Sequence, residues 1–292
     1  MRGGFYSRAT ISDPFDMCKI ASLIIGCLLL SAVAVAHEAG GTVHYLANEG
    51  VMAVHGDDKV VFDPLFNEDF GQYQRLPDHM RAALLAGDAP FDGIDAVFIS
   101  HYHDDHFDPE DMLSFLRNRD DVRLYAPQQA VDAMRALAPG ATDLFERVQA
   151  VDLAYGDAPA AFAMPGLRIG VVRIPHAGWP ERLLDVQNLA WRVTFDKGPT
   201  VLHLGDADTH DAHFAGDAAY WDAHRPNVAF PPYWYFLSRS GIDVLERLKP
   251  LLAIGIHVPI DVPEALDQRP PPPDGVDLFT TPGEMREIPA DR

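Results

Sequence analysis

The stretch His101-Tyr102-His103-Asp104-Asp105-His106 decides how this chain is interpreted, because it places three imidazoles and two carboxylates within six residues. It directly follows the apolar run 96–99, whose composition is that of a buried strand leading its loop to a pocket. The first two histidines are two residues apart, so a locally extended backbone points both rings the same way. Asp105 and His106 close the stretch at a point where the chain must turn, so their side chains can face a second position nearby. This loop could therefore supply ligands to two metal ions.

Three further residues that could bind metal each end an apolar run: His176 after 171–175, Asp206 after 201–205 and His257 after 252–256. A lone histidine after a strand is more often capped or solvated than a ligand, and a histidine-rich loop can also be an ordinary polar surface loop. Downstream of one dense cluster, three such strand ends favour a common site, because active sites of open α/β sheets collect at the carboxyl ends of strands. Imidazole nitrogen and carboxylate oxygen suit zinc and similar divalent ions.

The apolar patterns predict strands and helices in alternation after two opening hairpins. This order favours a layered α/β sandwich in one domain. Strands are expected over 42–46, 51–55, 59–62, 96–100, 122–125, 167–174, 189–195, 200–204, 227–230 and 252–257. Helices are expected over 77–85, 109–118, 127–137, 215–223 and 241–248.

The beginning of the chain predicts export. Residues 20–35 are apolar and end in Ala34-Val35-Ala36, so we expect a signal peptide over 1–36 and a single domain over 37–292. Translation could start at Met1 or at Met17. Anchoring as a lipoprotein at Cys27 is less favoured, because the apolar run continues past this cysteine. The protein is therefore expected to be periplasmic or secreted.

Composition limits the partners. Both cysteines, Cys18 and Cys27, lie in the leader, so the mature chain would hold metal through His, Asp or Glu and would have no disulfide. The net charge of -20 argues against nucleic acid and anionic membrane as partners and leaves a small-molecule substrate. We expect no stable membrane insertion after removal of the leader. The proline-rich segment 269–292 is interpreted as an extended tail.

The order and spacing of these residues resemble the metallo-β-lactamase fold superfamily of hydrolases. The match is His-x-His-x-Asp-His at 101–106, then His176 75 residues after the first histidine, Gly205-Asp206 with the aspartate 30 further, and His257 51 further. The hairpin at 42–55 and Asp63-Pro64 are also similar to the start of that family's fold. The resemblance implies a four-layer αβ/βα sandwich.

The resemblance also implies a role for each residue. The first metal ion would be bound by His101, His103 and His176, the second by Asp105, His106 and His257, and Asp206 would bridge them. Asp104 fills the variable position and should point away. Asp63 is either a carboxylate that orients a ligand imidazole or a turn residue before Pro64.

The activity implied is that of a metal-dependent hydrolase with two divalent ions, zinc first, manganese or iron next. A hydroxide bridging the ions and aimed by the catalytic Asp105 would cleave an ester, lactone, amide or phosphodiester bond. Asp206 resembles the lactonase and phosphodiesterase branches, since true β-lactamases have Cys or Ser there. The alternative is a non-catalytic metal-binding member that binds a ligand or a protein.

The aromatic segment 230–236 has two interpretations. Aromatic residues mostly serve packing, so the segment could belong to the core. Otherwise Tyr233, Trp234 and Tyr235 would contact an apolar or acylated substrate beside the metal ions. Two further histidines are not assigned as ligands: His203 is expected either in the core or beside the metal ligands, and His210 in a solvated loop.

If the leader is removed as expected, the mature protein starts near His37 and contains no thiol. Intact-mass measurement of protein from its native envelope fraction checks this. A lipid-modified Cys27 at the new N-terminus would contradict it.

Overall fold

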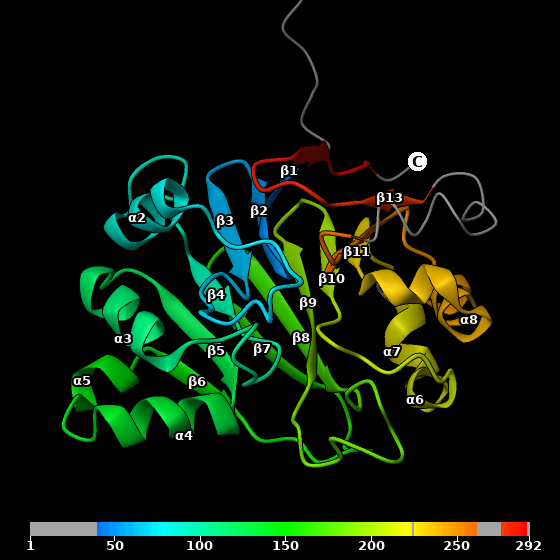
Figure 1. Ribbon diagram of the computed structural model, residues 1–292. Coiled ribbons are helices and arrows are strands. Elements are labelled where there is room, and N and C mark those ends of the chain that lie inside the picture. Colours follow the sequence, from blue (N-terminus) through cyan, green and yellow to red (C-terminus); the bar gives the residue numbers. More distant parts are fainter. Residues whose placement is uncertain (1–39, 224, 262–275, 291–292) are drawn as a thin grey trace, which may run out of the picture. The chain divides into compact units, whose positions relative to one another are not determined.

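Two β-sheets of seven strands each form the centre of the part of the chain that the computed structural model describes, residues 40–223, 225–261 and 276–290 (Figure 1). The expected leader, 1–36, lies outside the described residues. The first sheet has the order β14-β1-β2-β3-β4-β5-β6, with β1 (Thr42–Ala47), β2 (Gly50–His55), β3 (Asp58–Phe62), β4 (Ala96–Phe98), β5 (Arg123–Pro127), β6 (Val148–Val151) and β14 (Met285–Glu287).

The second sheet also combines antiparallel and parallel strands. Its order is β13-β12-β11-β10-β9-β8-β7, with β7 (Ala160–Met164), β8 (Leu167–Arg173), β9 (Leu189–Phe195), β10 (Thr200–His203), β11 (Val228–Phe230), β12 (Leu252–Gly255) and β13 (Asp277–Leu278). Strands β10 to β13 run parallel, as do β3 to β6 of the first sheet.

Helices cover the outer face of each sheet (Figure 1). The first sheet packs against α2 (Asp78–Ala86), α3 (Pro109–Asn118), α4 (Gln128–Leu137) and α5 (Thr142–Phe145). The second sheet packs against α6 (Ala212–Ala215), α7 (Ala218–Ala223), the 3₁₀-helix η1 (Tyr233–Leu237) and α8 (Arg239–Leu248). The predicted four-layer αβ/βα sandwich is confirmed. Of the described helices, none has the length and apolar character needed to cross a membrane.

Strand β4 shows why the sequence before the histidine cluster is continuously apolar. Its alternate side chains enter two different cores: Phe98 packs between the sheets, whereas Val97 faces the helices. A strand that is buried on both faces needs apolar residues at every position. Phe98 stacks on Phe62 and Tyr125, with ring centroids 5.3 and 5.1 Å away.

Most predicted elements are present, but the predicted helix over 215–223 is wrong in its extent. The chain forms two short helices there, because a turn in which the amide of Asp217 donates to the carbonyl of Phe214 separates α6 from α7. Helix α3 begins as the sequence predicts: Asp108 caps it by accepting from the amide of Asp111 at 2.8 Å, and Pro109 occupies the first turn.

The interpretation of residues 269–292 as a tail is corrected for the described part, 276–290. Strand β13 pairs with β12, and β14 pairs with β1, so this segment adds an edge strand to each sheet. Phe279 stacks on Tyr45 at 5.1 Å inside the core between the sheets. Short two- and three-residue strands carry too little periodicity to be read from sequence. The proline run at 270–273 lies outside the described residues.

Replacing Phe98 by alanine is expected to lower the free energy of unfolding by about 3–5 kcal/mol, because a fully buried ring between two sheets leaves a cavity. Leu137→Ala is the control, since this leucine is 51% exposed, and it should change stability by less than about 0.5 kcal/mol. Urea unfolding of both variants measures the difference. Equal effects would contradict the packing described for β4.

Candidate metal centre

Four strand ends converge to form one site. The dense histidine loop follows β4, and the other three donor positions follow β8, β10 and β12. A bridge between His176 and Ala207 brings two of these loops side by side. The structure therefore brings together all seven residues that the resemblance assigns to metal: His101, His103, Asp105, His106, His176, Asp206 and His257.

Three histidines form the first cluster. Nε2 of His101 lies 3.1 Å from Nδ1 of His103. The ring of His176 lies 4.9 Å from the ring of His101 and 4.8 Å from the ring of His103, between centroids. One nitrogen of each ring thus faces a common point.

The second cluster combines two histidines with Asp105. Its Oδ2 lies 3.3 Å from Nε2 of His257 and 3.7 Å from Nε2 of His106. Each of these three side chains is at least nine-tenths buried. The residues of the loop 101–106 are thus divided between two clusters, as the sequence predicts.

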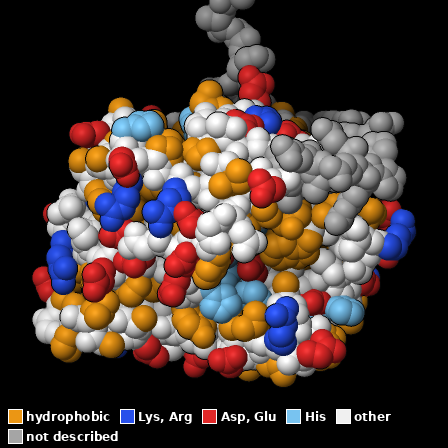
Figure 2. Space-filling model, viewed as in Figure 1, with side chains coloured by type: hydrophobic (Ala, Val, Ile, Leu, Met, Phe, Trp, Pro, Cys, Tyr) orange, Lys and Arg blue, Asp and Glu red, His pale blue; other side chains and the backbone are white. Residues whose placement is uncertain are grey.

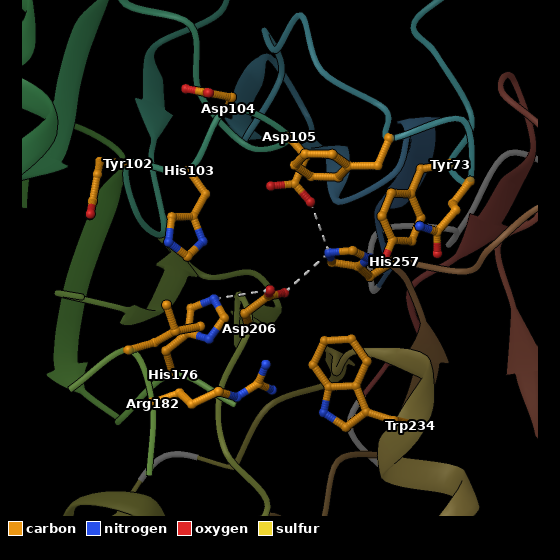
Figure 3. A pocket seen from close by; sticks show the side chains of 13 residues that line it. Tyr73, Tyr102, His103, Asp104, Asp105, His176, Arg182, Asp206, Trp234 and His257 are labelled. Atoms are coloured by element: carbon orange, nitrogen blue, oxygen red, sulfur yellow. Dashed lines mark ion pairs between the residues drawn. The ribbon is translucent and has the colours of Figure 1, made fainter. Parts of the chain in front are cut away.

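Asp206 lies between the two clusters, and its two oxygens face different ones (Figure 3). Oδ2 is 3.2 Å from Nε2 of His176, in the first cluster. Oδ1 is 3.4 Å from Nε2 of His257 and 3.5 Å from Nε2 of His106, in the second. A carboxylate in this position can bind one cation through each oxygen.

Buried atoms without partners show that this donor set fits divalent ions. Nε2 of His106, Nε2 of His176 and Oδ1 of Asp206 are buried and have no hydrogen-bond partner. A buried polar atom without a partner costs free energy unless something binds it. Zinc bonds of about 2.1 Å in tetrahedral geometry place neighbouring donor atoms about 3.4 Å apart. The separations across the two clusters are close to that value.

The electrostatics point to the same requirement for cations. Burial raises the pKa of Asp206, but His257, His106 and His176 outweigh burial and hold it well below its usual range. Burial lowers the pKa of His106, but the carboxylates around it, Asp206 first, raise it well above its usual range. A proton on His106 thus offsets part of the charge of the buried carboxylates, and a cation would replace this proton on binding.

Burial, followed by the neighbouring His106, lowers the pKa of His101 well below its usual range. Burial, followed by His176, also lowers the pKa of His103. Both rings are therefore neutral at physiological pH, which is the form that binds a metal ion.

Gly205 and Asn188 position the bridging aspartate. Gly205 has a φ of 54°, and an added Cβ would lie 2.4 Å from Oδ1 of Asn188, so only glycine fits before Asp206. The same Oδ1 accepts from the amide of Asp206 at 3.0 Å, while Nδ2 donates to the carbonyl of Leu204 at 3.1 Å. Asn188 is not recognisable as a site residue from the sequence, because nothing in its local pattern marks it.

The structure favours the orienting role for Asp63 over the turn role. Its Oδ1 accepts from the amide of Ser100 at 2.7 Å, and its Oδ2 lies 3.1 Å from Nδ1 of His106. A hydrogen bond at Nδ1 leaves Nε2 of His106 free to bind metal. Asp63 is fully buried, which strengthens this contact.

The turn between β1 and β2 also supports the centre, although the sequence analysis did not select it. Nδ2 of Asn48 donates to the carbonyl of Asp105 at 2.8 Å, and the carbonyl of Asn48 accepts from the amide of His257 at 3.0 Å. The carbonyl of Glu49 accepts from Nε2 of His203 at 3.0 Å. His203 is a buried core residue, as predicted.

A cavity of about 570 Å³ opens over the centre. Its wall includes Tyr73, whose ring meets that of His257 edge-on at 4.2 Å between centroids. Burial, followed by the charges of Asp206 and Asp105, raises the pKa of Tyr73, so its hydroxyl stays protonated. In Figure 3, Asp104 points away from the ligand cluster, as predicted, although it lines the rim.

The three aromatic residues predicted to contact substrate have different surroundings. Trp234 lines the cavity, whereas Tyr233 is not among its lining residues. The prediction is wrong for Tyr235, which is fully buried and donates from its hydroxyl to the carbonyl of Asp208 at 3.1 Å. His210 lies in an exposed loop, where its Nδ1 contacts Oδ1 of Asp208 at 2.5 Å.

The sequence profile described as the beta-lactamase superfamily domain matches residues 58–227, more than half of the chain. The chain belongs to this family. The matched region contains six of the seven donor residues, all but His257. Family membership and the assembled donors confirm the predicted class of protein, a metal-dependent hydrolase. A search among curated proteins found no match.

Solved structures share the fold of this superfamily domain at low sequence identity. The metallo-beta-lactamase fold protein YhfI from Bacillus subtilis is 14% identical, with 85% of this chain and 99% of that chain covered and a TM-score of 0.54. Igni18, a metallo hydrolase from Ignicoccus hospitalis, is 16% identical over 86% and 100% of the chains, at 0.53. An isothiocyanate hydrolase from Delia radicum gut bacteria is 14% identical over 84% and 98%, at 0.54.

The purified protein is expected to contain close to two divalent ions per chain, because each cluster offers three donor residues and Asp206 can offer an oxygen to both. Elemental analysis of protein prepared without chelator measures the content. A content near zero that added zinc, manganese or iron does not restore would contradict this assignment of ligands.

Proposed function

We propose that this protein is a binuclear metal-dependent hydrolase that cleaves an ester, lactone, amide or phosphodiester bond of a small molecule. The observation that carries the proposal is Asp206, whose two oxygens face two separate donor clusters beneath one cavity. His101, His103 and His176 would hold one ion, and Asp105, His106 and His257 the other. Zinc is the first expectation, because imidazole dominates the donor set, with manganese or iron next.

Divalent ions at these positions would supply an activated water molecule near neutral pH and would polarise the bond to be cleaved. The residues of the chain contribute orientation and proton handling. Asp105 lines the cavity with Oδ2 turned to His257, so its other oxygen can accept a hydrogen bond from the attacking water. The hydroxyl of Tyr73, protonated beside His257, is a candidate donor to the substrate or the leaving group.

Asp206 supports the assignment of this protein to the lactonase and phosphodiesterase branches of the family. An aspartate that offers an oxygen to each cluster matches the lactonase and phosphodiesterase branches that the sequence resembles, rather than dedicated β-lactamases. Trp234 adds an apolar wall to the cavity, which suits a lactone or an acylated substrate.

The alternative, a non-catalytic metal-binding module, is less well supported. Such a module would not need an acceptor for the attacking water, a bridging carboxylate and an open cavity together, and this chain has all three. We also propose that the protein works outside the cytoplasm. Support for this comes from the apolar leader sequence alone.

Replacing Asp206 by asparagine is expected to lower turnover by at least about 10-fold, with a smaller loss of metal. The amide keeps the shape but removes the charge that balances two cations. Asp104→Asn is the matched control, since Asp104 points away from the ligands (Figure 3), and it should change turnover little. Turnover and metal content are measured side by side on lactone, thioester, phosphodiester and β-lactam substrates, with and without chelator.

Equal losses for the two variants would show that the ligands are misassigned. Metal-loaded wild-type protein that cleaves no member of the panel, or cleaves it equally well after metal removal, would overturn the proposed hydrolysis.

A further inference from the structure

One basic side chain lies among the residues that line the cavity. Arg182 belongs to the loop that follows His176, and the remaining ionisable side chains of the wall are histidine, aspartate and tyrosine. Figure 3 shows its guanidinium directed into the cavity, between Asp206 and Trp234. On this face, histidine side chains reach the surface between hydrophobic ones, with a basic side chain next to them (Figure 2).

Within residues 40–223, 225–261 and 276–290, Arg182 has no carboxylate within ion-pair distance and its guanidinium makes no hydrogen bond. Among the described arginines, Arg75, Arg119 and Arg286 are paired with carboxylates, whereas Arg182 and the exposed Arg117 are not. Arg182 differs from Arg117 because it lines the cavity. An unpaired guanidinium that is directed into a cavity is available to bind a ligand.

The loop that carries Arg182 is held at several points. Its amide donates to the carbonyl of Gly178 at 2.9 Å. The guanidinium of Arg173 donates to the carbonyls of Leu184 and Val186 at 3.3 and 3.2 Å, and Nε2 of Gln129 donates to the backbone carbonyl of Asp185 at 2.9 Å. The backbone of Arg182 is therefore placed before a ligand arrives, which reduces the entropy lost on binding.

Apolar side chains flank this arginine at the mouth of the cavity. Phe70 and Leu183 both line it and are 56% and 36% exposed. Exposed apolar groups around a pocket indicate a ligand with a matching apolar part. The wall thus offers three separate features: metal donors at the base, an apolar rim and one cation.

We propose that the substrate carries an anionic oxygen group, a carboxylate or a phosphate, separated from the bond to be cleaved by an apolar segment, and that Arg182 binds this group. The inference rests on the proposed hydrolysis at the same site. A planar guanidinium donates two parallel hydrogen bonds to such a group, which lysine cannot do. Arg182 therefore determines specificity for charge, whereas the metal donors determine where the bond is cleaved.

The test uses two esters of equal chain length that differ in charge, 4-nitrophenyl hydrogen glutarate and neutral 4-nitrophenyl valerate. In metal-loaded mature protein, Arg182→Gln should lower the ratio of the two kcat/KM values, anionic over neutral, by about tenfold, because the arginine is partly exposed. Arg182→Lys should restore part of that ratio. Arg117→Gln on α3 removes an exposed arginine outside the cavity wall and should leave both esters unchanged. An unaltered ratio in Arg182→Gln would overturn the proposal.

Calorimetry separates this proposal from the proposed hydrolysis. 4-Phenylbutyrate, 4-phenylbutylphosphonate and neutral 4-phenylbutyramide are titrated into wild-type protein and Arg182→Gln, whose metal ligands are the same. The Kd of at least one anion should rise about tenfold in the variant, without a matching rise for the amide. The anion that loses more affinity identifies the group as carboxylate or phosphate.

If the wild-type protein cleaves neither ester, the proposed ester hydrolysis fails, and the calorimetry alone decides the role of Arg182. Equal anion binding by wild-type protein and Arg182→Gln would overturn the anion site, whether or not the esters are cleaved.

Discussion

The carboxylate of Asp206 is the contact on which the rest of the site depends. It lies within 3.5 Å of imidazole nitrogens from both clusters, so one side chain can offer an oxygen to each group of ligands. The fold holds this side chain in one orientation, because Gly205 turns with a positive φ and Asn188 binds the amide of Asp206. Two cations can share a small volume only if a charge of this kind lies between them.

The first sheet contributes the supports as well as the dense ligand loop. The turn at Asn48 binds the backbone of both Asp105 and His257, which come from different sheets. Asp63, which directly follows β3 of the first sheet, orients His106 through its Nδ1. The ligands of the second cluster are thus oriented by residues at the beginning of the chain, so packing between the sheets and geometry at the metal centre depend on each other.

The strong negative charge of the chain and the character of its cavity are compatible for a physical reason. Acidic residues elsewhere favour solubility, whereas metal ions and Arg182 would make the potential positive where a substrate binds. Chemistry and specificity are also carried by different parts of the fold. Strand ends provide the donors, whereas Phe70, Tyr73, Arg182 and Trp234 come from loops and a 3₁₀-helix, which can vary without disturbing the sheets.

The sequence alone determined the layers and the donor set, because short apolar runs mark the strands locally and the donors follow these runs directly. Only the tertiary structure decided which atoms of residues far apart meet. Asn188 and Asn48 act through single hydrogen bonds across the fold, and Arg182 lies in an irregular loop, so none of them has a local signature. Tyr235 shows the same limit: in a 3₁₀-helix successive side chains diverge by about 120°, so Trp234 reaches the cavity while its neighbour enters the core.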